Sequence, residues 1–488
     1  MNMKIVPAFI VGFLSVAIFM TSCLSDDTQE ITYSKEASIK SFSLGTLKIQ
    51  RIGKDKSGND SAYVDTMSMA KYPFTIDQLK HEISNKDSLP VGTDISKVIT
   101  NISADTPYIL YGKIAKKGEE AKDTLWTNTD SLDFSIAPAE GIVFKVMAYD
   151  GSLGTPYKVK VNVHNQVPDS LQWTQDVIGS SFVSGAMTKQ KAVYLNQKVF
   201  VFGQNSDGET VAEYTKVSEK GQPSAWTKIA LPTGVDSYSA LASGEMIYFL
   251  ADGKLYAMDG DGLYAEIAPA APVALSKLVA SVNTKRGATV FALTAGSDTK
   301  EISYTVADGW SEQQETALNA NVPYYVFDTI PTSYNDEIKG MVVLAQSSAD
   351  YGFVAARQSN DDFWSAYDFA SRDTSRCPNI ENPTLLYYGK KLIAFGGAVS
   401  TKDYAKYKDP FSTIYCSTDH GLTWKPTAGS LLTFAVGKNH KTFAQLYAEN
   451  GNNYSCVADP NHFIWVVWGN GMMSRGRINY YGFAPKQW

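Results

Sequence analysis

The chain has 488 residues, of which 44% are hydrophobic and 19% are charged. This balance is too apolar for a disordered chain and too polar for a protein with many membrane spans. Lys and Arg number 44 against 50 Asp and Glu, which gives a net charge of −6. No lysine-rich block creates a local positive charge in this acidic chain, so we expect no nucleic-acid partner.

The first 22 residues have the pattern of an export signal. The cation Lys4 is followed by an uncharged, mostly apolar run over residues 5–20, shorter than the ~20 residues of a spanning helix. Two small residues then precede Cys23, and this arrangement resembles the lipoprotein box of bacterial lipoproteins. The departure is Met20, where that family usually has Leu. The resemblance implies that Cys23 is diacylated and anchors the mature chain in a membrane; a signal peptide with an incidental cysteine is the alternative.

Residues 23–30 form an acidic tether. Ser25, Asp26 and Asp27 follow the cysteine closely, and they resemble the export tag of Bacteroidetes surface lipoproteins. The resemblance implies a lipid anchor in the outer membrane and exposure at the cell surface. A solvated acidic linker is the alternative.

Three more cysteines, Cys377, Cys416 and Cys456, lie in the mature chain. An exported protein can form disulfides, but the sequence does not choose a pair among three. Without a CxxC pair or histidines at ligand spacing, we expect no metal site and no cofactor.

Residues 31–165 predict an all-β domain, which we interpret as an Ig-like β-sandwich. Two alternating runs, 142–149 and 157–163, flank Asp150-Gly151 and indicate a hairpin. Residues 88–96 look like a phrase common in β-sandwich domains of Bacteroidetes lipoproteins. One amphipathic stretch, Ile76 to Ile83, is predicted to be helical. Residues 166–170 are a plausible linker.

Residues 171–488 contain a repeat, which predicts a β-propeller. Six short apolar runs recur: 199–202, 246–250, 289–293, 341–345, 392–395 and 463–468. Five are followed by an aromatic residue that would end the repeat: Trp226, Tyr264, Trp310, Trp364 and Trp424. The sixth lacks one, apart from the terminal Trp488, whereas an unassigned strand around Trp173 precedes the first run. We therefore predict six blades, the last closed by the strand at 171–174; seven or eight blades remain possible if one is degenerate.

Two predicted blades carry family signatures, one of them only a degenerate Asp box at residues 359–364. Residues 392–397, with Tyr415 and Trp424, resemble a kelch repeat. Residues 417–424 resemble the Asp box of sialidase-like propellers, a structural turn remote from the catalytic face, defined here by four residues: Ser417, Asp419, Gly421 and Trp424. The lipoprotein box, sandwich and propeller together resemble a two-domain Bacteroidetes lipoprotein family with no established activity.

Catalytic signatures are missing from the sequence. It has no phosphate loop, no GxSxG elbow and no HExxH helix. The Arg-Ile-Pro phrase of sialidases is missing too, and the chain offers few arginines for their triad. Asp259-Gly260-Asp261-Gly262 lacks the twelfth-position Glu of a calcium loop and is better interpreted as a hairpin turn. We name no catalytic residue.

The sequence favours a non-catalytic surface protein that binds a glycan or another protein through the propeller rim. A glycan-cleaving propeller enzyme, either glycosidase or lyase, is the alternative. The rim is expected to carry the loops after the apolar runs, opposite the Asp box. Its candidate ligand-binding residues are Lys402, Tyr404, Tyr407 and Arg475. For Tyr404 and Tyr407, a place in an aromatic strand of the blade is the alternative; the oligomeric state stays open.

Overall fold

The computed structural model describes residues 32–54, 60–367, 375–427, 432–434 and 440–483. The chain divides into two compact units, one ending at Val167 and one beginning at Pro168. Among the described residues, no helix combines the length and the apolar character that crossing a bilayer would need. Lipidation and export residues Cys23, Ser25, Asp26 and Asp27 lie outside the described residues, as does Trp488.

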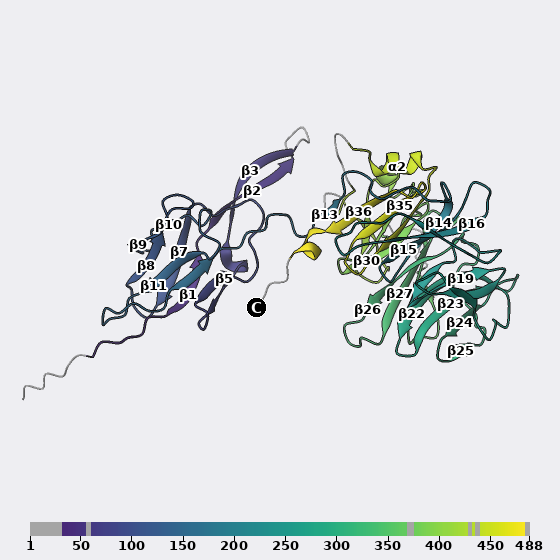
Figure 1. Cartoon of the computed structure of the whole chain (residues 1–488), viewed down its shortest axis with the longest axis horizontal. Coiled ribbons are helices and arrows are strands. Elements are labelled where there is room, and N and C mark those ends of the chain that lie inside the picture. Colours follow the sequence, from purple (N-terminus) through teal and green to yellow (C-terminus); the bar gives the residue numbers. More distant parts are fainter. Residues whose placement is uncertain (1–31, 55–59, 368–374, 428–431, 435–439, 484–488) are drawn as a thin grey trace, which may run out of the picture. The chain divides into compact units, whose positions relative to one another are not determined.

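The N-terminal unit is built from three sheets (Figure 1). One has the order β1 (Ile39–Leu44), β7 (Val98–Ala104), β10 (Ser131–Leu132). A second has the order β3 (Asp60–Met67), β2 (Leu47–Lys54), β6 (Thr93–Asp94). The largest has the order β4 (Phe74–Asp77), β5 (Glu82–Asn85), β12 (Tyr157–Lys160), β11 (Ile142–Val146), β8 (Ile109–Lys113), β9 (Lys122–Leu125). A short 3₁₀ helix, η1 (Met69–Lys71), follows β3.

These sheets bury their apolar faces against one another. Phe42 of β1 and Leu47 of β2 share one core with Ile83 of β5 and Phe144 of β11. Strand β1 alternates between buried and exposed residues from Phe42 to Leu44, as a sheet with one face in a core requires, and its register shifts between Ile39 and Ser41. The expected β-sandwich is therefore present, with β11 and β12 paired antiparallel as the predicted hairpin.

The helix predicted over Ile76 to Ile83 is wrong. Ile76 lies in β4 and Ile83 in β5, and the two are direct partners across an antiparallel pair. His81, with φ of 53°, takes the left-handed conformation in the turn between the strands. The apolar spacing that suggested one helix face arises because the hairpin brings both side chains to the same side of the sheet.

The C-terminal unit is a propeller of six four-stranded sheets, counted over the described residues (Figure 1). We number them as blades 1–6. The order from the inside outwards is as follows for blades 1–3: β14 (Thr188–Leu195), β15 (Lys198–Gln204), β16 (Thr210–Lys216), β17 (Thr227–Ile229); β18 (Leu241–Ser243), β19 (Met246–Ala251), β20 (Lys254–Met258), β21 (Tyr264–Glu266); β22 (Leu275–Thr284), β23 (Gly287–Thr294), β24 (Glu301–Thr305), β25 (Gly309–Trp310).

Blades 4–6 repeat this arrangement. Their strands are β26 (Val326–Pro331), β27 (Lys339–Ala345), β28 (Phe353–Gln358), β29 (Ser365–Ala366); β30 (Thr384–Tyr388), β31 (Lys391–Phe395), β32 (Tyr415–Ser417), β33 (Lys425–Pro426); β34 (Tyr454–Ala458), β35 (Ile464–Trp468), β36 (Met473–Ile478), β13 (Leu171–Trp173). Helix α2 (Phe443–Glu449) precedes blade 6, and the 3₁₀ helices η2 (Ala405–Tyr407) and η3 (Asn479–Gly482) lie in blade 5 and after β36.

The six apolar runs predicted from the sequence are the second strands of the six blades. They are apolar throughout because each second strand is covered on both faces by neighbouring blades. Strand β35 is fully buried along its length. The aromatic residues predicted to end each repeat lie at or just before the fourth strands, although Tyr264 is exposed and does not pack between blades.

The ring closes as predicted, with β13 as the outermost strand of the last blade. Leu171 pairs with Ile478 and Trp173 with Gly476. The indole N–H of Trp173 donates to the carbonyl oxygen of Thr433 at 2.9 Å. The first strand of the unit thus completes a sheet made otherwise from its last segment, so the ring is held together by hydrogen bonds between its two ends.

Candidate ligand-binding site

The propeller encloses a cavity of about 650 Å³ on its axis. It is lined by the innermost strands of all six blades: β14, β18, β22, β26, β30 and β34. Each of these strands pairs on one side only, so its other edge faces the axis with backbone N–H and C=O groups that no strand pairs. Side chains bind some of them, as the Ser281 hydroxyl binds the carbonyl oxygen of Ala242. The cavity wall is therefore polar along its backbone, and its size lies within the ~300–1,000 Å³ typical of ligand sites.

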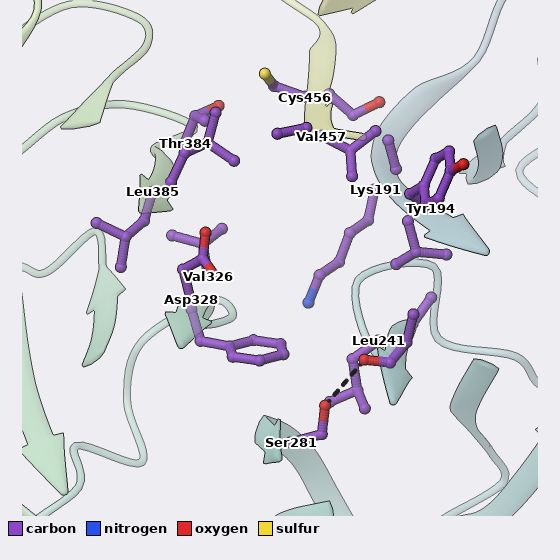
Figure 2. A pocket seen from close by; sticks show the side chains of 18 of the residues that line it. Lys191, Tyr194, Leu241, Ser281, Val326, Asp328, Thr384, Leu385, Cys456 and Val457 are labelled. Carbon is purple, nitrogen blue, oxygen red and sulfur yellow. Dashed lines mark hydrogen bonds between the residues drawn. The ribbon is translucent and has the colours of Figure 1, made fainter. Parts of the chain in front are cut away.

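Lys191 extends from β14 into this cavity (Figure 2). Its ammonium donates to the carbonyl oxygens of Tyr238 at 3.0 Å and Tyr325 at 3.2 Å. Two of the three ammonium hydrogens are thus bound by uncharged groups. Burial lowers the pKa of Lys191 to about 8, and the carboxylate of Asp236 opposes that shift.

Asp328 of β26 lies on the other side of the same cavity (Figure 2). Its carboxylate accepts from the backbone N–H of Tyr387 at 2.7 Å and from that of Thr329 at 2.6 Å. Burial raises the pKa of Asp328 to about 6, although these hydrogen bonds act in the opposite direction. Lys191 and Asp328 are only half-buried, yet both are strongly desolvated. The reason is that the surface that they expose faces the cavity.

Four lining residues carry charge at neutral pH, two lysines and two aspartates: Lys191, Asp328, Lys339 and Asp459. Asp459 is only 4% exposed, and its two oxygens accept from the backbone N–H of Phe463 and the indole N–H of Trp465, both at 2.9 Å. Over the described residues, no ion pair is formed by Lys191 or Asp328. Lys339 begins β27 and pairs with Pro331 at the end of β26. Lys191 and Asp328, each without an ion-pair partner, therefore face one water-accessible space, which is unusual for groups so strongly desolvated.

The cavity has two different ends. Where the inner strands begin, Tyr238 and Tyr324 stack with their ring centres 4.0 Å apart and their planes 8° apart. Where the inner strands end, the lining residues Gly244, Asn283 and Pro460 are exposed. The mouth of the cavity is therefore at this second end, which carries the turns between first and second strands.

The residues predicted for the rim are not gathered into one site. Lys402 is exposed and Tyr407 half-buried, whereas Tyr404 is only 5% exposed and belongs to the core between blades 4 and 5. The Tyr404 hydroxyl donates to the carbonyl oxygen of Arg376 at 3.0 Å, and its ring packs edge-on against Tyr415. A side chain used in this way has no free surface for a ligand.

Arg475 lies within strand β36, where it pairs with Trp465, and not in a rim loop as expected. Its guanidinium donates to the carbonyl oxygens of Lys220 and Gly221 and covers the ring of Phe463, 4.9 Å from the ring centre. Arg475 therefore connects blade 6 to the outer turn of blade 1, on the face opposite the predicted rim.

The Asp-box residues form a turn between β32 and β33. The Asp419 carboxylate accepts from the Thr423 backbone N–H at 2.8 Å and from the Ser417 hydroxyl at 2.8 Å. Gly421 has φ of +87°, and a Cβ there would lie 2.9 Å from a methyl group of Val342 in blade 4. Trp424 is 1% exposed in the core between blades 4 and 5, so these contacts stabilise the blade interface.

Cys377, Cys416 and Cys456 all carry free thiols. Cys456 lines the axial cavity, and burial raises the pKa of its thiol well above the usual range. Across the described ranges, no group of three His, Cys, Asp or Glu side chains is arranged to hold a metal ion. Asp259 makes the hairpin turn expected of it, accepting from the N–H groups of Asp261 and Leu263 between β20 and β21.

Two protein-family models match the chain. Residues 167–486 match the model of the DUF6242 beta propeller domain. Residues 42–161 match the model of the N-terminal domain of the same family, described as a domain of unknown function. No curated protein matches the chain.

Solved structures are similar to part of this chain at low sequence identity. AofleA from Arthrobotrys oligospora is 12% identical, and the match covers 63% of this chain and 86% of that one with a TM-score of 0.36. A carbohydrate-active enzyme of family AA12 from Trichoderma reesei is 10% identical over 64% and 96% of the chains, with a TM-score of 0.38. Aleuria aurantia lectin, in complex with alpha-methyl-L-fucoside, is 12% identical over 62% and 95%, with a TM-score of 0.33. Likeness at this level says nothing of the ligand.

Proposed function

The chain belongs to the DUF6242 family. We propose that its propeller binds a glycan in the axial cavity without cleaving it. The observation that carries the proposal is the cavity itself, with a size suited to a small ligand and a wall supplied by six unpaired strand edges. The propeller is the binding unit in this account.

The chemistry of the wall suits a sugar, which combines hydroxyl groups with apolar ring faces. Hydroxyl and amide groups line it at Ser281, Asn283 and Thr384, while Val326 and Phe327 supply apolar surface. Figure 2 shows Ser281, Thr384 and Val326. Hydrogen-bonding groups fix a ligand's orientation, and apolar lining supplies most of the buried contact. A flat aromatic ring can also stack on a sugar face.

Cleavage is less well supported than binding. Most glycoside hydrolases place two carboxyl groups on either side of the bond that they break. The cavity lining contains two, but Asp459 is only 4% exposed, whereas Asp328 is half-buried. Only Asp328 then faces the space where a glycan would lie.

A cavity-filling substitution tests the proposed binding. We expect the full-length protein to select at least one glycan from an array of neutral and acidic oligosaccharides, and we expect no release of reducing ends from it. Val457→Trp, in the cavity wall, should weaken that binding at least about tenfold, because it removes the volume that the ligand needs. The control is Val183→Trp, the same change at a residue that is 65% exposed and outside the lining.

If Val457→Trp binds the selected glycan as well as the wild type does, the ligand lies elsewhere on the protein. Clear release of reducing ends by the wild type would show that the enzyme alternative is correct.

We also propose that the protein is anchored through Cys23 and displayed at the surface of an outer membrane. The lipoprotein box and the acidic residues Ser25, Asp26 and Asp27 support this. Cys23→Ala should move the protein from the membrane fraction to the soluble one, whereas Cys416→Ala should leave it membrane-bound. Added protease should digest the wild type on intact cells. Unchanged fractionation of Cys23→Ala would contradict the anchor, and full protection from protease would contradict display.

A further inference from the structure

Lys191 and Asp328 are not paired with opposite charges within the protein. Lys191 is held by two carbonyl oxygens, from blades 2 and 4, and Figure 2 shows its side chain extending into the cavity. Carbonyl dipoles stabilise an ammonium less than a carboxylate does. A desolvated cation without a carboxylate partner therefore gains a great deal from an anion brought by a ligand.

The other lone charge defines a second requirement. Asp328 receives two backbone N–H groups from its own strand and from β30, which occupies part of the acceptor capacity of a carboxylate. The rest faces the cavity and favours a donor, such as a hydroxyl group, over a second anion. A ligand that binds both Lys191 and Asp328 carries one acidic group and several hydroxyl groups.

We infer that the glycan bound in the axial cavity contains an acidic sugar, whose anionic group is bound by Lys191 while a hydroxyl group donates to Asp328. This inference rests on the proposed glycan-binding function and specifies its ligand class. A singly charged group, either a carboxylate or a sulfate ester, matches the one ammonium that is held by the carbonyl oxygens of Tyr238 and Tyr325. Lys339, the other lysine of the lining, lies at the end of β26 where the mouth is. A phosphate monoester adds a second negative charge, which the carbonyl oxygens of Tyr238 and Tyr325 would repel.

Calorimetric titration of the full-length protein with three probes tests this ligand class. D-glucuronate and D-glucose 6-sulfate carry the acidic group, and D-glucose is their neutral counterpart. We expect at least one acidic probe to bind roughly ten- to hundredfold more tightly than glucose, the difference made by one hydrogen-bonded charge. Comparison of the two acidic probes shows which anionic group the site accepts.

Variants assign that preference to Lys191. Lys191→Met keeps the apolar stem and removes the charge, so it should bind acidic and neutral probes alike. Lys191→Arg should keep part of the preference because it keeps the cation. Lys228→Met is the matched control, since Lys228 is exposed on the outermost strand of the same blade; it should titrate as the wild type does. Wild-type and variant melting temperatures without sugar show whether each variant is folded.

Three outcomes would contradict the inference, and they have different consequences for the proposed glycan binding. If the glycans selected by the array are all neutral and the wild type does not prefer an acidic probe, the acidic ligand class is wrong while glycan binding stands. If neither the array nor the probes show any binding, both are wrong. A preference that survives in Lys191→Met also contradicts the role of Lys191.

Discussion

Gln172→Pro should lower the free energy of unfolding of the propeller by about 3 kcal/mol, because it breaks the strand that closes the ring. In the pair β13–β36, the Thr174 N–H donates to the carbonyl of Arg475 at 2.8 Å, and the Asn479 N–H donates to that of Ser170 at 3.0 Å. Gln172 pairs with Arg477 midway between these bonds, where an antiparallel ladder is again hydrogen-bonded. Proline removes the donor at that point and its ring displaces the strand.

The matched control for this prediction is Gln172→Ala. The Gln172 side chain is exposed and donates only to the hydroxyl of Ser170, at 2.6 Å, so its loss should cost less than about 0.5 kcal/mol. Eight of the nine tryptophans lie in the propeller unit, so tryptophan fluorescence during urea unfolding reports this unit. Equal midpoints for the proline and alanine variants would show that β13 does not hold the ring closed.

Trp468→Ala should destabilise the propeller by about 3–5 kcal/mol, the range measured for removing a large buried aromatic side chain. Trp468 is fully buried in the core between blades 5 and 6. Its ring centre lies 5.3 Å from that of Phe443 and 5.6 Å from that of Phe411, and its indole N–H donates to the Ser474 hydroxyl at 3.0 Å. Alanine leaves a cavity that a rigid interface between sheets fills poorly.

Trp468→Phe separates packing from hydrogen bonding at this site. It keeps most of the ring contacts and loses the bond to Ser474, so it should cost about 1–2 kcal/mol. Both variants should be measured by urea unfolding with far-UV circular dichroism, since each lacks a tryptophan. An alanine variant no less stable than the phenylalanine variant would mean that Trp468 is not packed as described.

Much of the propeller could be predicted because its second strands leave a distinct trace in the sequence. A strand covered on both faces must be apolar throughout, as 463–468 is. The strand around Trp173 stood out because it had no blade of its own. Helix α2 was missed, although Thr442 and Gln445 form a capping box at its start; it has only seven residues, too few to show a period.

The binding site was harder to predict, for a physical reason. Lys191 stands in β14 next to Gln190 and Ala192, and a polar residue in a partly apolar strand normally indicates a face in solvent. What sets Lys191 apart is the cavity formed by six strands far apart in the chain, which no local pattern records. Conversely, Tyr404 lies in a segment whose Tyr and Lys residues suggested a recognition loop, but its side chain packs in the core between blades 4 and 5.

The position of a bound sugar tests most directly whether the axial cavity is the binding site. A crystal structure of the full-length protein, soaked with D-glucuronate or with D-glucose 6-sulfate at a concentration above the measured Kd, decides this. We expect sugar density in the axial cavity, with the acidic group within hydrogen-bonding distance of Lys191 Nζ and a hydroxyl group at the Asp328 carboxylate. A cavity that holds only water, with the sugar bound at the rim around Lys402 and Tyr407, would contradict this expectation.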